Sequence, residues 1–425
     1  MTEPTQQQET RKRSRFRLQT FAALKYRDYR LLWFAQIGAA LTQQSEMLTR
    51  SLLVIEITRE EGGGMGNAAL FIGLVHATRF IGGLALTPVM GVLADRVDRR
   101  YLLITANLVN GGFFLLVALL IITDQVALWH VVISATVAGA AQTMDLTSRQ
   151  AMIPSLVPRE GIMNGIALSS TLMGSSRIIG PAMTGFMVVY MGLEGAYLMT
   201  AAFVIFPVVL YFFMRPVRLQ RDQPHLSFFK SFKEGFQFAI HEPSVRVVLL
   251  VGITVVTIAM PFLQLLPVYV EEVLQADAGT LGLIIAIPGF LTLIGGLIAA
   301  SAGDYRRKGL MLFLAVSSPA TAAVILSQTS MVWTAMLGVA VFAAFSSQYQ
   351  PTTQTTVMKA TPEHLRGRVA SLLAMAQNLG SVGVIIWGVV MIPLGVQGTY
   401  LLFGVVALSL FITYFATIPA FRRLS

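Results

Sequence analysis

The sequence predicts an all-α membrane protein in which twelve transmembrane helices form two six-helix bundles. Hydrophobic residues make up 55% of the 425 residues, charged residues make up only 12%, and the mean hydropathy is +0.69. A soluble domain carries about 25% charged residues. The second observation is a series of apolar stretches of about 20 residues, the length that a helix needs to cross a bilayer core. A polar linker divides this series six and six.

The predicted spans follow one another with short charged or glycine-rich turns between them. They are residues 29–56, 67–91, 101–122, 128–150, 162–190, 197–214, 246–270, 279–302, 309–328, 331–356, 369–393 and 399–418. Asp28-Tyr-Arg30 at the start of the first half matches Ser244-Val-Arg246 at the start of the second, which indicates a duplicated unit. We expect a basic tail over 1–27, a first bundle over 28–214, a linker over 215–245 and a second bundle over 246–425.

The linker contains a stretch with the pattern of an amphipathic helix. Phe228, Phe229, Phe232 and Phe236 share one helical face, and the lysines of this stretch lie off that face. The pattern predicts a helix that lies in the membrane interface. A regulatory site for a partner is the alternative.

The net charge of +10 is distributed so as to fix topology. Of the 31 lysine and arginine residues, 27 fall on one face of the predicted membrane protein, and only Arg59 falls in a loop on the other face. Basic loops stay in the cytoplasm. We therefore expect a multi-pass protein of the plasma (bacterial inner) membrane with both termini cytoplasmic. Because the positive charge sets topology, it gives no reason to expect nucleic acid as a partner. We expect the lipid bilayer as a partner.

A dense group of charged residues separates the second and third predicted spans. It reads Gly91-Val-Leu-Ala-Asp95-Arg96-Val-Asp98-Arg99-Arg100 and is too short to hold a domain, so it predicts a tight turn between two membrane helices. Asp95 and Arg99 are four residues apart and can pair along one helical face. Taken as charge alone, the turn does no more than set topology.

This turn resembles the signature loop between helices two and three of the major facilitator superfamily, with Asp98 in place of a glycine. The resemblance covers nearly the whole chain. Arg30-Leu-Leu-Trp-Phe-Ala-Gln36 and Pro362-Glu-His-Leu-Arg-Gly-Arg-Val369 are similar to the branch of macrolide-efflux proteins, enterobactin exporters and related transmembrane secretion effectors. It implies the major facilitator fold, with substrate handled between the two bundles.

Polar residues in the first span make it a candidate for chemistry. Thr42, Gln43, Glu46, Thr49 and Arg50 lie on one stripe of an otherwise apolar helix. Such a stripe must face protein or water, and ionisable groups at this depth are costly unless paired. Glu46 and Arg50 are four residues apart and can neutralise one another. Their pair is either structural or a part of proton coupling or substrate contact.

Three further ionisable residues lie inside predicted spans. Arg79 is near the middle of the second span and Arg177 near the middle of the fifth. An arginine keeps its proton, so each forms either an internal salt bridge or a contact with substrate. His76 is the second candidate for proton coupling, because imidazole titrates near neutral pH. The alternative for His76 is a hydrogen-bonded interior histidine.

The fifth span contains Gly174-Ser-Ser-Arg177-Ile-Ile-Gly180-Pro181-Ala-Met-Thr-Gly185. Its glycines permit close packing and its proline bends the helix. The stretch resembles the antiporter motif of the superfamily, which implies export against a proton gradient. A generic packing helix is the alternative.

The end of the fourth span contributes to a predicted conformational latch. Asp145 and Arg149 are four residues apart beside the charged turn. The resemblance implies that an acidic residue here joins the signature loop and holds one conformation. The predicted latch comprises Gly91, Asp95, Arg99, Asp145 and Arg149.

The second half offers neutral residues for a substrate cavity. The tenth span is polar and broken by proline around Gln348 and Tyr349. With Gln264, Gln377 and Asn378 in other spans, these join Gln43, Arg50, Arg79 and Arg177 as candidate cavity residues.

The sequence contains no phosphate-binding loop, no metal-ligand cluster, no nucleophile–base pair and no cysteine. We therefore expect no enzyme, no metal and no cofactor, and an ion gradient as the energy source. The prediction is a monomeric transporter that exports small amphipathic or hydrophobic compounds in exchange for protons, with sodium as the alternative ion. Export of an anionic metabolite or siderophore is the alternative substrate class. A non-transporting membrane sensor or scaffold is the alternative of another kind.

Overall fold

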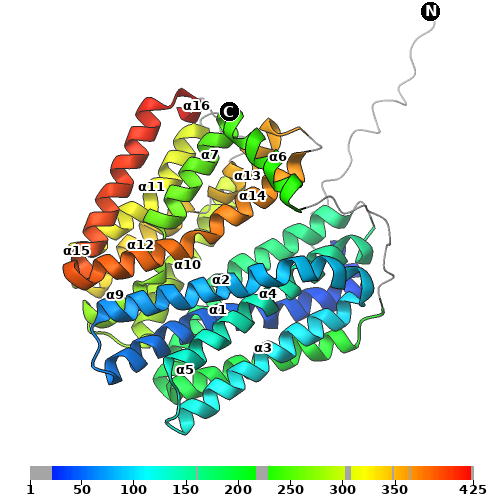
Figure 1. Cartoon of the computed structure of the whole chain (residues 1–425), viewed down its shortest axis with the longest axis horizontal. Coiled ribbons are helices and arrows are strands. Elements are labelled where there is room, and N and C mark those ends of the chain that lie inside the picture. The colour runs from blue at the N-terminus through cyan, green and yellow to red at the C-terminus, as the bar shows by residue number, and fades with distance from the viewer. Residues whose placement is uncertain are drawn as a thin grey trace, which may run out of the picture.

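The computed structural model describes residues 22–158, 161–216, 228–301, 308–346, 349–362 and 365–422, and these ranges are helical with short connections. They contain no strand. Six of the described helical segments are long and apolar enough to cross a membrane. The chain is therefore an all-helical membrane protein (Figure 1).

Five helices form the first half and lie together in Figure 1. After a short 3₁₀ turn, η2 (Ala22–Lys25), they are α1 (Arg27–Glu60), α2 (Met65–Arg96), α3 (Arg99–Ile122), α4 (Leu128–Leu156) and α5 (Ile162–Phe212). The predicted spans 162–190 and 197–214 both fall in α5, where the backbone leaves the helical conformation at Gly192 with φ of +71°. Only glycine adopts this conformation without strain, so Gly192 is the turn between those two spans.

The second half begins with α6 (Phe228–His241), in the predicted linker. The remaining elements are α7 (Pro243–Thr254), the π-turn η4 (Val255–Ala259), α8 (Pro261–Gln264), α9 (Leu266–Glu272), α10 (Ala278–Ser301), α11 (Lys308–Ser327), α12 (Val332–Ser346), α13 (Tyr349–Ala360), α14 (Arg366–Asn378), α15 (Gly380–Thr417) and α16 (Pro419–Arg422). Gly395 in α15 repeats the turn at Gly192, with φ of +68°.

The predicted span 246–270 is broken into α7, η4, α8 and α9. Pro261 and Pro267 lack the backbone N–H that would continue a regular helix. The carbonyls freed in a membrane helix need other donors. The indole of Trp387 donates to the carbonyl of Ile258 over 3.1 Å, and the hydroxyl of Tyr400 donates to that of Phe262 over 2.7 Å. The break is therefore held by α15.

The connections define two ends of the molecule. We call the end with the turn at 97–98 and the starts of α1 and α7 the basic end, and the end with residues 61–64, Gly192 and Gly395 the far end. The turn between α2 and α3 is shorter than its sequence suggests, because both helices continue into the charged group. Asp98 caps the start of α3, and its carboxylate accepts a hydrogen bond from the N–H of Arg100 over 3.0 Å. A glycine, which the resemblance leads one to expect here, could not make this cap.

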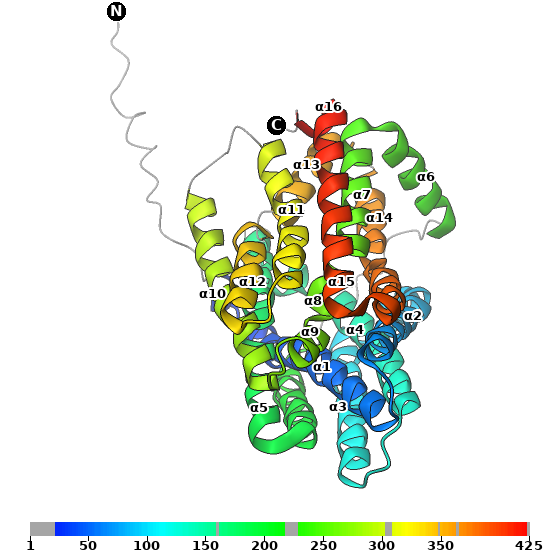
Figure 2. The ribbon, with the colours of Figure 1, turned by 90° about the vertical axis from the view of Figure 1, so that its left-hand side faces the viewer.

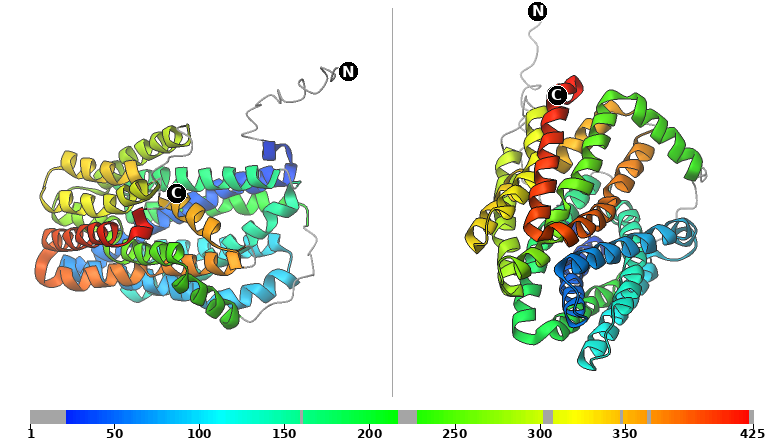
Figure 3. Two further views of the ribbon diagram at one scale, coloured as in Figure 1. Left: turned by 90° about the horizontal axis from the view of Figure 1, so that it is seen from above. Right: turned by 60° about the vertical axis from the view of Figure 1, so that its left-hand side comes forward.

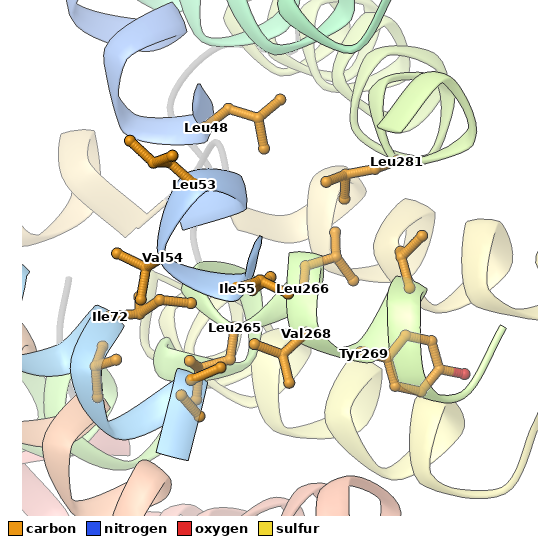
Figure 4. Close-up of a cluster of buried hydrophobic side chains, with 14 of the residues drawn as sticks. Leu48, Leu53, Val54, Ile55, Ile72, Leu265, Leu266, Val268, Tyr269 and Leu281 are labelled. Carbon is orange, nitrogen blue, oxygen red and sulfur yellow. The ribbon is translucent and has the colours of Figure 1, made fainter. Parts of the chain in front are cut away.

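The two halves are in close contact at the far end. Gly73 of α2 lies against the backbone of Ile385, and Gly388 of α15 lies against that of Leu70. A shared apolar cluster lies beside these contacts and includes Leu53, Val54, Ile72, Leu265, Leu266, Val268 and Leu281 (Figure 4). Figure 2 views this end and shows α8 and α9 between α1 and the helices of the second half. The far end is therefore closed by helix packing.

The helix α6 packs against α7 and α14 (Figure 3). Glu234 forms an ion pair with Arg368 of α14, and Gly235 and Ala239 are buried on the same side. Phe236 and Ile240 are 46% and 43% exposed on another side. A helix is present where the sequence predicts one, and its contact with the membrane interface stays a prediction.

Candidate functional site

A buried group of charges lies at the centre of the first half. One carboxylate oxygen of Glu46 forms ion pairs with Nη1 of Arg50 at 2.5 Å and with Nη1 of Arg79 at 2.6 Å. The side chain of Glu46 is 1% exposed, that of Arg50 5% and that of Arg79 15%. The predicted pair of Glu46 and Arg50 is confirmed, and Arg79 is a second partner of the same carboxylate.

Neutral groups on α4 complete this charge cluster. Arg79 donates from Nη2 and Nε to the amide oxygen of Gln142, over 3.1 and 3.3 Å. Arg50 donates to the hydroxyl of Ser134 over 3.4 Å. Two guanidinium groups therefore share one carboxylate, and the cluster carries a net charge of +1. An excess charge at this depth attracts an anion into the neighbouring space, because a low dielectric screens it weakly.

Local sequence explains how these side chains meet. Four of the five residues of the stripe predicted on α1 are buried, namely Thr42, Glu46, Thr49 and Arg50, and Gln43 is half-buried. On the other helices, Gly82 and Gly139 bring α2 and α4 into backbone contact. This close approach carries Arg79 to within reach of both Glu46 and Gln142.

Arg79 lines two separate cavities. A small one lies between α1 and α2 and is lined by His76, Arg50 and Arg79 together with apolar residues. The other lies inside the first half and is lined by residues of α1, α2, α3 and α4, among them Gln43, Glu46 and Arg79. The structure thus brings together both candidates for proton coupling and three of the predicted cavity residues.

The basic end holds part of the predicted latch. Asp145 forms an ion pair with Arg149 and accepts from the amide of Asn107 over 3.4 Å. Arg99 reaches the same helix, where Nη1 donates to the carbonyl of Ala151 over 2.8 Å. Gly91 and Asp95 lie in the last two turns of α2, but their surroundings are outside what the structure describes. The latch stays a prediction.

The antiporter-motif residues lie in the first part of α5. Gly180 lies against Gln44 of α1, within the same half, and Pro181 is buried. Gly185 instead lies against Ala278 and Gly282 of α10, in the other half. A single motif therefore supports packing both within the first half and across to the second. Gly174 and Arg177 are in α5, and their surroundings are not described.

The remaining predicted cavity residues are all in the second half. Gln264 is the last residue of α8 and lies near Gly380. The hydroxyl of Tyr349 lies near Gly252 of α7. Gln377 and Asn378 end α14 with undescribed side chains, and Gln348 lies outside the described residues. Among the described contacts, none joins Gln264 or Tyr349 to the charge cluster.

Sequence reasoning missed an ion pair between the halves at the far end. Arg59 of α1 pairs with Glu271 of α9 beside a cavity of about 430 Å³. Asp277 lines the same cavity, and hydrogen bonds from the N–H and hydroxyl of Thr280, both 2.8 Å, lower the pKa of its carboxyl. Arg59 is the one basic residue that the charge count places in a loop of this face. Its position apart from the other basic residues was the sequence signal for a specific ionic contact.

We expect Arg59→Glu to weaken closure of the far end, because it sets a third carboxylate beside Glu271 and Asp277. Arg59 is 60% exposed, and an exposed pair contributes only about 0–1 kcal/mol, so the expected change in transport rate is a few-fold. The exchanged variant Arg59→Glu/Glu271→Arg should recover most of the rate. Equal rates in the single and exchanged variants would show that the pair does not hold the two halves together.

Paired ionisable groups inside membrane-spanning helices mark the pathways of ions or substrates, so the fold and the charge cluster together define a membrane transporter. The chain matches the Major Facilitator Superfamily over residues 35–383 and 265–424 and belongs to that family.

Curated relatives and solved structures agree with this membership. The enterobactin exporter of Shigella boydii serotype 4 is 25% identical over 343 residues, 81% of this chain and 77% of that protein. The enterobactin exporter of Escherichia coli O1:K1 is 27% identical over 346 residues, with the same coverage of both chains. The structure of a POT family transporter in complex with 5-aminolevulinic acid superposes with a TM-score of 0.75 at 12% identity, over 93% of this chain and 96% of that one. The last comparison concerns the fold alone.

Proposed function

We propose that this chain exports small molecules in exchange for protons and that Glu46 carries the proton. The observation that carries the proposal is the Glu46 carboxylate held between Arg50 and Arg79 at 2.5 and 2.6 Å. Arginines cannot exchange the proton themselves. When Glu46 takes up a proton, both ion pairs weaken at once, so protonation changes how α1 is held against α2 and α4.

The architecture we propose is that of two six-helix bundles, over 28–214 and 246–425, which rock about a binding site between them. Gly192 and Gly395 act as the turns that divide α5 and α15 into two spans each. The basic end faces the cytoplasm of a bacterial inner membrane, as the distribution of lysine and arginine favours. With the far end packed shut, this arrangement corresponds to a conformation that opens inward.

The substrate class that we favour is a small amphipathic compound with anionic groups. The net charge of +1 in the charge cluster attracts such groups toward it. The relatives named as enterobactin exporters support the siderophore class. Export of apolar drug-type compounds is the second candidate, favoured by the resemblance of residues 30–36 and 362–369 to the macrolide-efflux branch.

Transport by the purified protein in proteoliposomes tests the proposal. With a pH gradient imposed, we expect enterobactin to accumulate on the side to which the far end opens, and to do so at a higher rate than ethidium. Collapsing the gradient with a protonophore should stop accumulation and leave downhill movement. If accumulation follows a sodium gradient and not a pH gradient, the coupling ion is sodium and not the proton. The absence of gradient-dependent movement of either compound would favour a membrane sensor or scaffold.

A further inference from the structure

We propose that a polar cavity inside the first half conducts protons between Glu46 and Asp145, apart from the path that the substrate takes. This inference rests on the proposed role of Glu46 as the proton carrier. It adds the route by which the proton reaches that buried carboxylate and the residues that form the route.

One cavity contacts both carboxylates. It has a volume of about 40 Å³, and its lining comes only from α1, α2, α3 and α4: Ala39, Thr42, Gln43, Glu46, Arg79, Ala106, Asn107, Asn110, Ala141, Gln142 and Asp145. No residue of the second half is among them. A path through this cavity therefore does not cross the space between the two halves, where the substrate is handled.

The lining suits a short chain of water molecules. One water needs about 10–15 Å³ of such volume and two to four polar partners. Within the described structure, the amide oxygen of Asn110 and the hydroxyl of Thr42 are buried and have no hydrogen-bond partner. Most buried polar atoms in proteins have a hydrogen-bond partner, either in the protein or in ordered water, so water is the partner that these two atoms can take. Asn110 and Thr42 thus supply acceptors and a donor along the cavity wall.

The two ends of the cavity differ in exposure. The side chain of Glu46 is 1% exposed and that of Asp145 is 14% exposed. Asp145 lies toward the basic end, where it pairs with Arg149 and accepts from Asn107. Arg79 lines the cluster end of the cavity, whereas Arg50, the other partner of Glu46, lines the second cavity together with His76. The cavity therefore leads from a sealed carboxylate to one near the solution.

Proton movement along this route needs no additional reactant. A proton that enters beside Asp145 forms an O–H bond with a water of the cavity, and that water gives up another proton toward Glu46. At the last step an O–H bond forms on the Glu46 carboxylate as one breaks on the neighbouring water. Arg79 then loses its ionic partner and keeps Gln142. Deprotonation of Glu46 reverses these steps.

The route is tested by removing polar groups from the cavity wall without changing either carboxylate. Asn110→Leu replaces an amide with an apolar group of similar size, and Thr42→Val removes a hydroxyl with little change in shape. In the full-length protein, protonation of Glu46 is followed after a pH jump by infrared absorption of its carboxylic C=O, assigned by its loss in Glu46→Gln. We expect Asn110→Leu to slow the rise of this band about tenfold, a change in barrier of about 1.4 kcal/mol.

Matched variants separate the route from general effects of mutation. Asn110→Ala leaves room for water and should slow protonation less than Asn110→Leu does. Leu108→Phe, on an exposed side of the same helix α3, should leave the rate unchanged. A rate in both Asn110→Leu and Thr42→Val equal to that of the unaltered protein would overturn the route while leaving Glu46 as the carrier. The absence of any band that depends on Glu46 would overturn the proposed carrier, and the route with it.

Discussion

Glu46→Gln is expected to abolish uphill transport while downhill exchange of substrate continues. Glutamine keeps the shape of the side chain and its ability to accept a hydrogen bond but cannot be charged or exchange a proton. Among the described residues, Glu46 is the one carboxylate that pairs with Arg50 and Arg79. A second carboxylate that could take over its role is therefore not in the cluster. Accumulation driven by a pH gradient and exchange at equal concentrations, measured on the same proteoliposomes, check the two halves of this expectation.

The same substitution has a cost in stability that must be separated from its effect on coupling. Removing one partner of a buried ion pair costs roughly 3–5 kcal/mol, because the remaining charge stays buried. Glu46→Gln leaves two guanidinium groups without a counter-charge. The double variant Glu46→Gln/Arg50→Gln returns the cluster to a net charge of +1 and should unfold at a temperature closer to that of the unaltered protein. It should still fail to pump.

Two further variants make the result specific. Glu56→Gln changes an exposed carboxylate on α1, away from the charge cluster, and should transport normally. His76→Asn tests the competing candidate, which lines the small cavity next to Arg79. Uphill transport that survives in Glu46→Gln and is lost in His76→Asn would identify His76 as the carrier and leave Glu46 as a structural partner of the arginines.

The sequence predicts most helices of this fold because each span has a simple physical signature. Length and apolarity place α3, α10 and α11 within two residues of their observed bounds, and α1, α2 and α4 within six. The i,i+4 spacing also predicts the pairs of Glu46 with Arg50 and of Asp145 with Arg149. These features depend on local geometry, which a single helix already fixes.

Features that depend on contacts between helices could not be predicted in this way. The ion pair of Arg79 with Glu46 depends on the close approach of α2 and α4. The ion pair of Arg59 with Glu271 depends on how the two halves pack together. One signal was present and unused. Met191-Gly192-Leu-Glu-Gly195-Ala-Tyr197 repeats as Leu394-Gly395-Val-Gln-Gly398-Thr-Tyr400. The repeat predicts that both glycines make the same turn, as they do.

Gly388→Leu is expected to reduce transport at least about tenfold by preventing closure of the far end. A Cβ atom at this position would lie 2.5 Å from Cα of Leu70, so α15 and α2 must separate to accept any side chain. Overpacking of this kind costs about 1–3 kcal/mol, and here the cost applies only to conformations in which the two halves touch at this end. An equilibrium between two conformations shifts by the free energy that distinguishes them, so the population with the far end open should rise.

A distance across the far end measures this shift directly. The chain has no cysteine, so spin labels at Glu61→Cys and Met331→Cys, both exposed positions, report a single pair. Gly388→Leu should lengthen the dominant distance, and Gly112→Leu, which meets no atom within 4 Å, should leave both the distance and transport unchanged. Normal transport with an unchanged distance in Gly388→Leu would mean that α2 and α15 can repack around a leucine. Closure of the far end would then depend on the apolar cluster around Leu53 and Leu266, because the ion pair of Arg59 with Glu271 is too exposed to hold it alone.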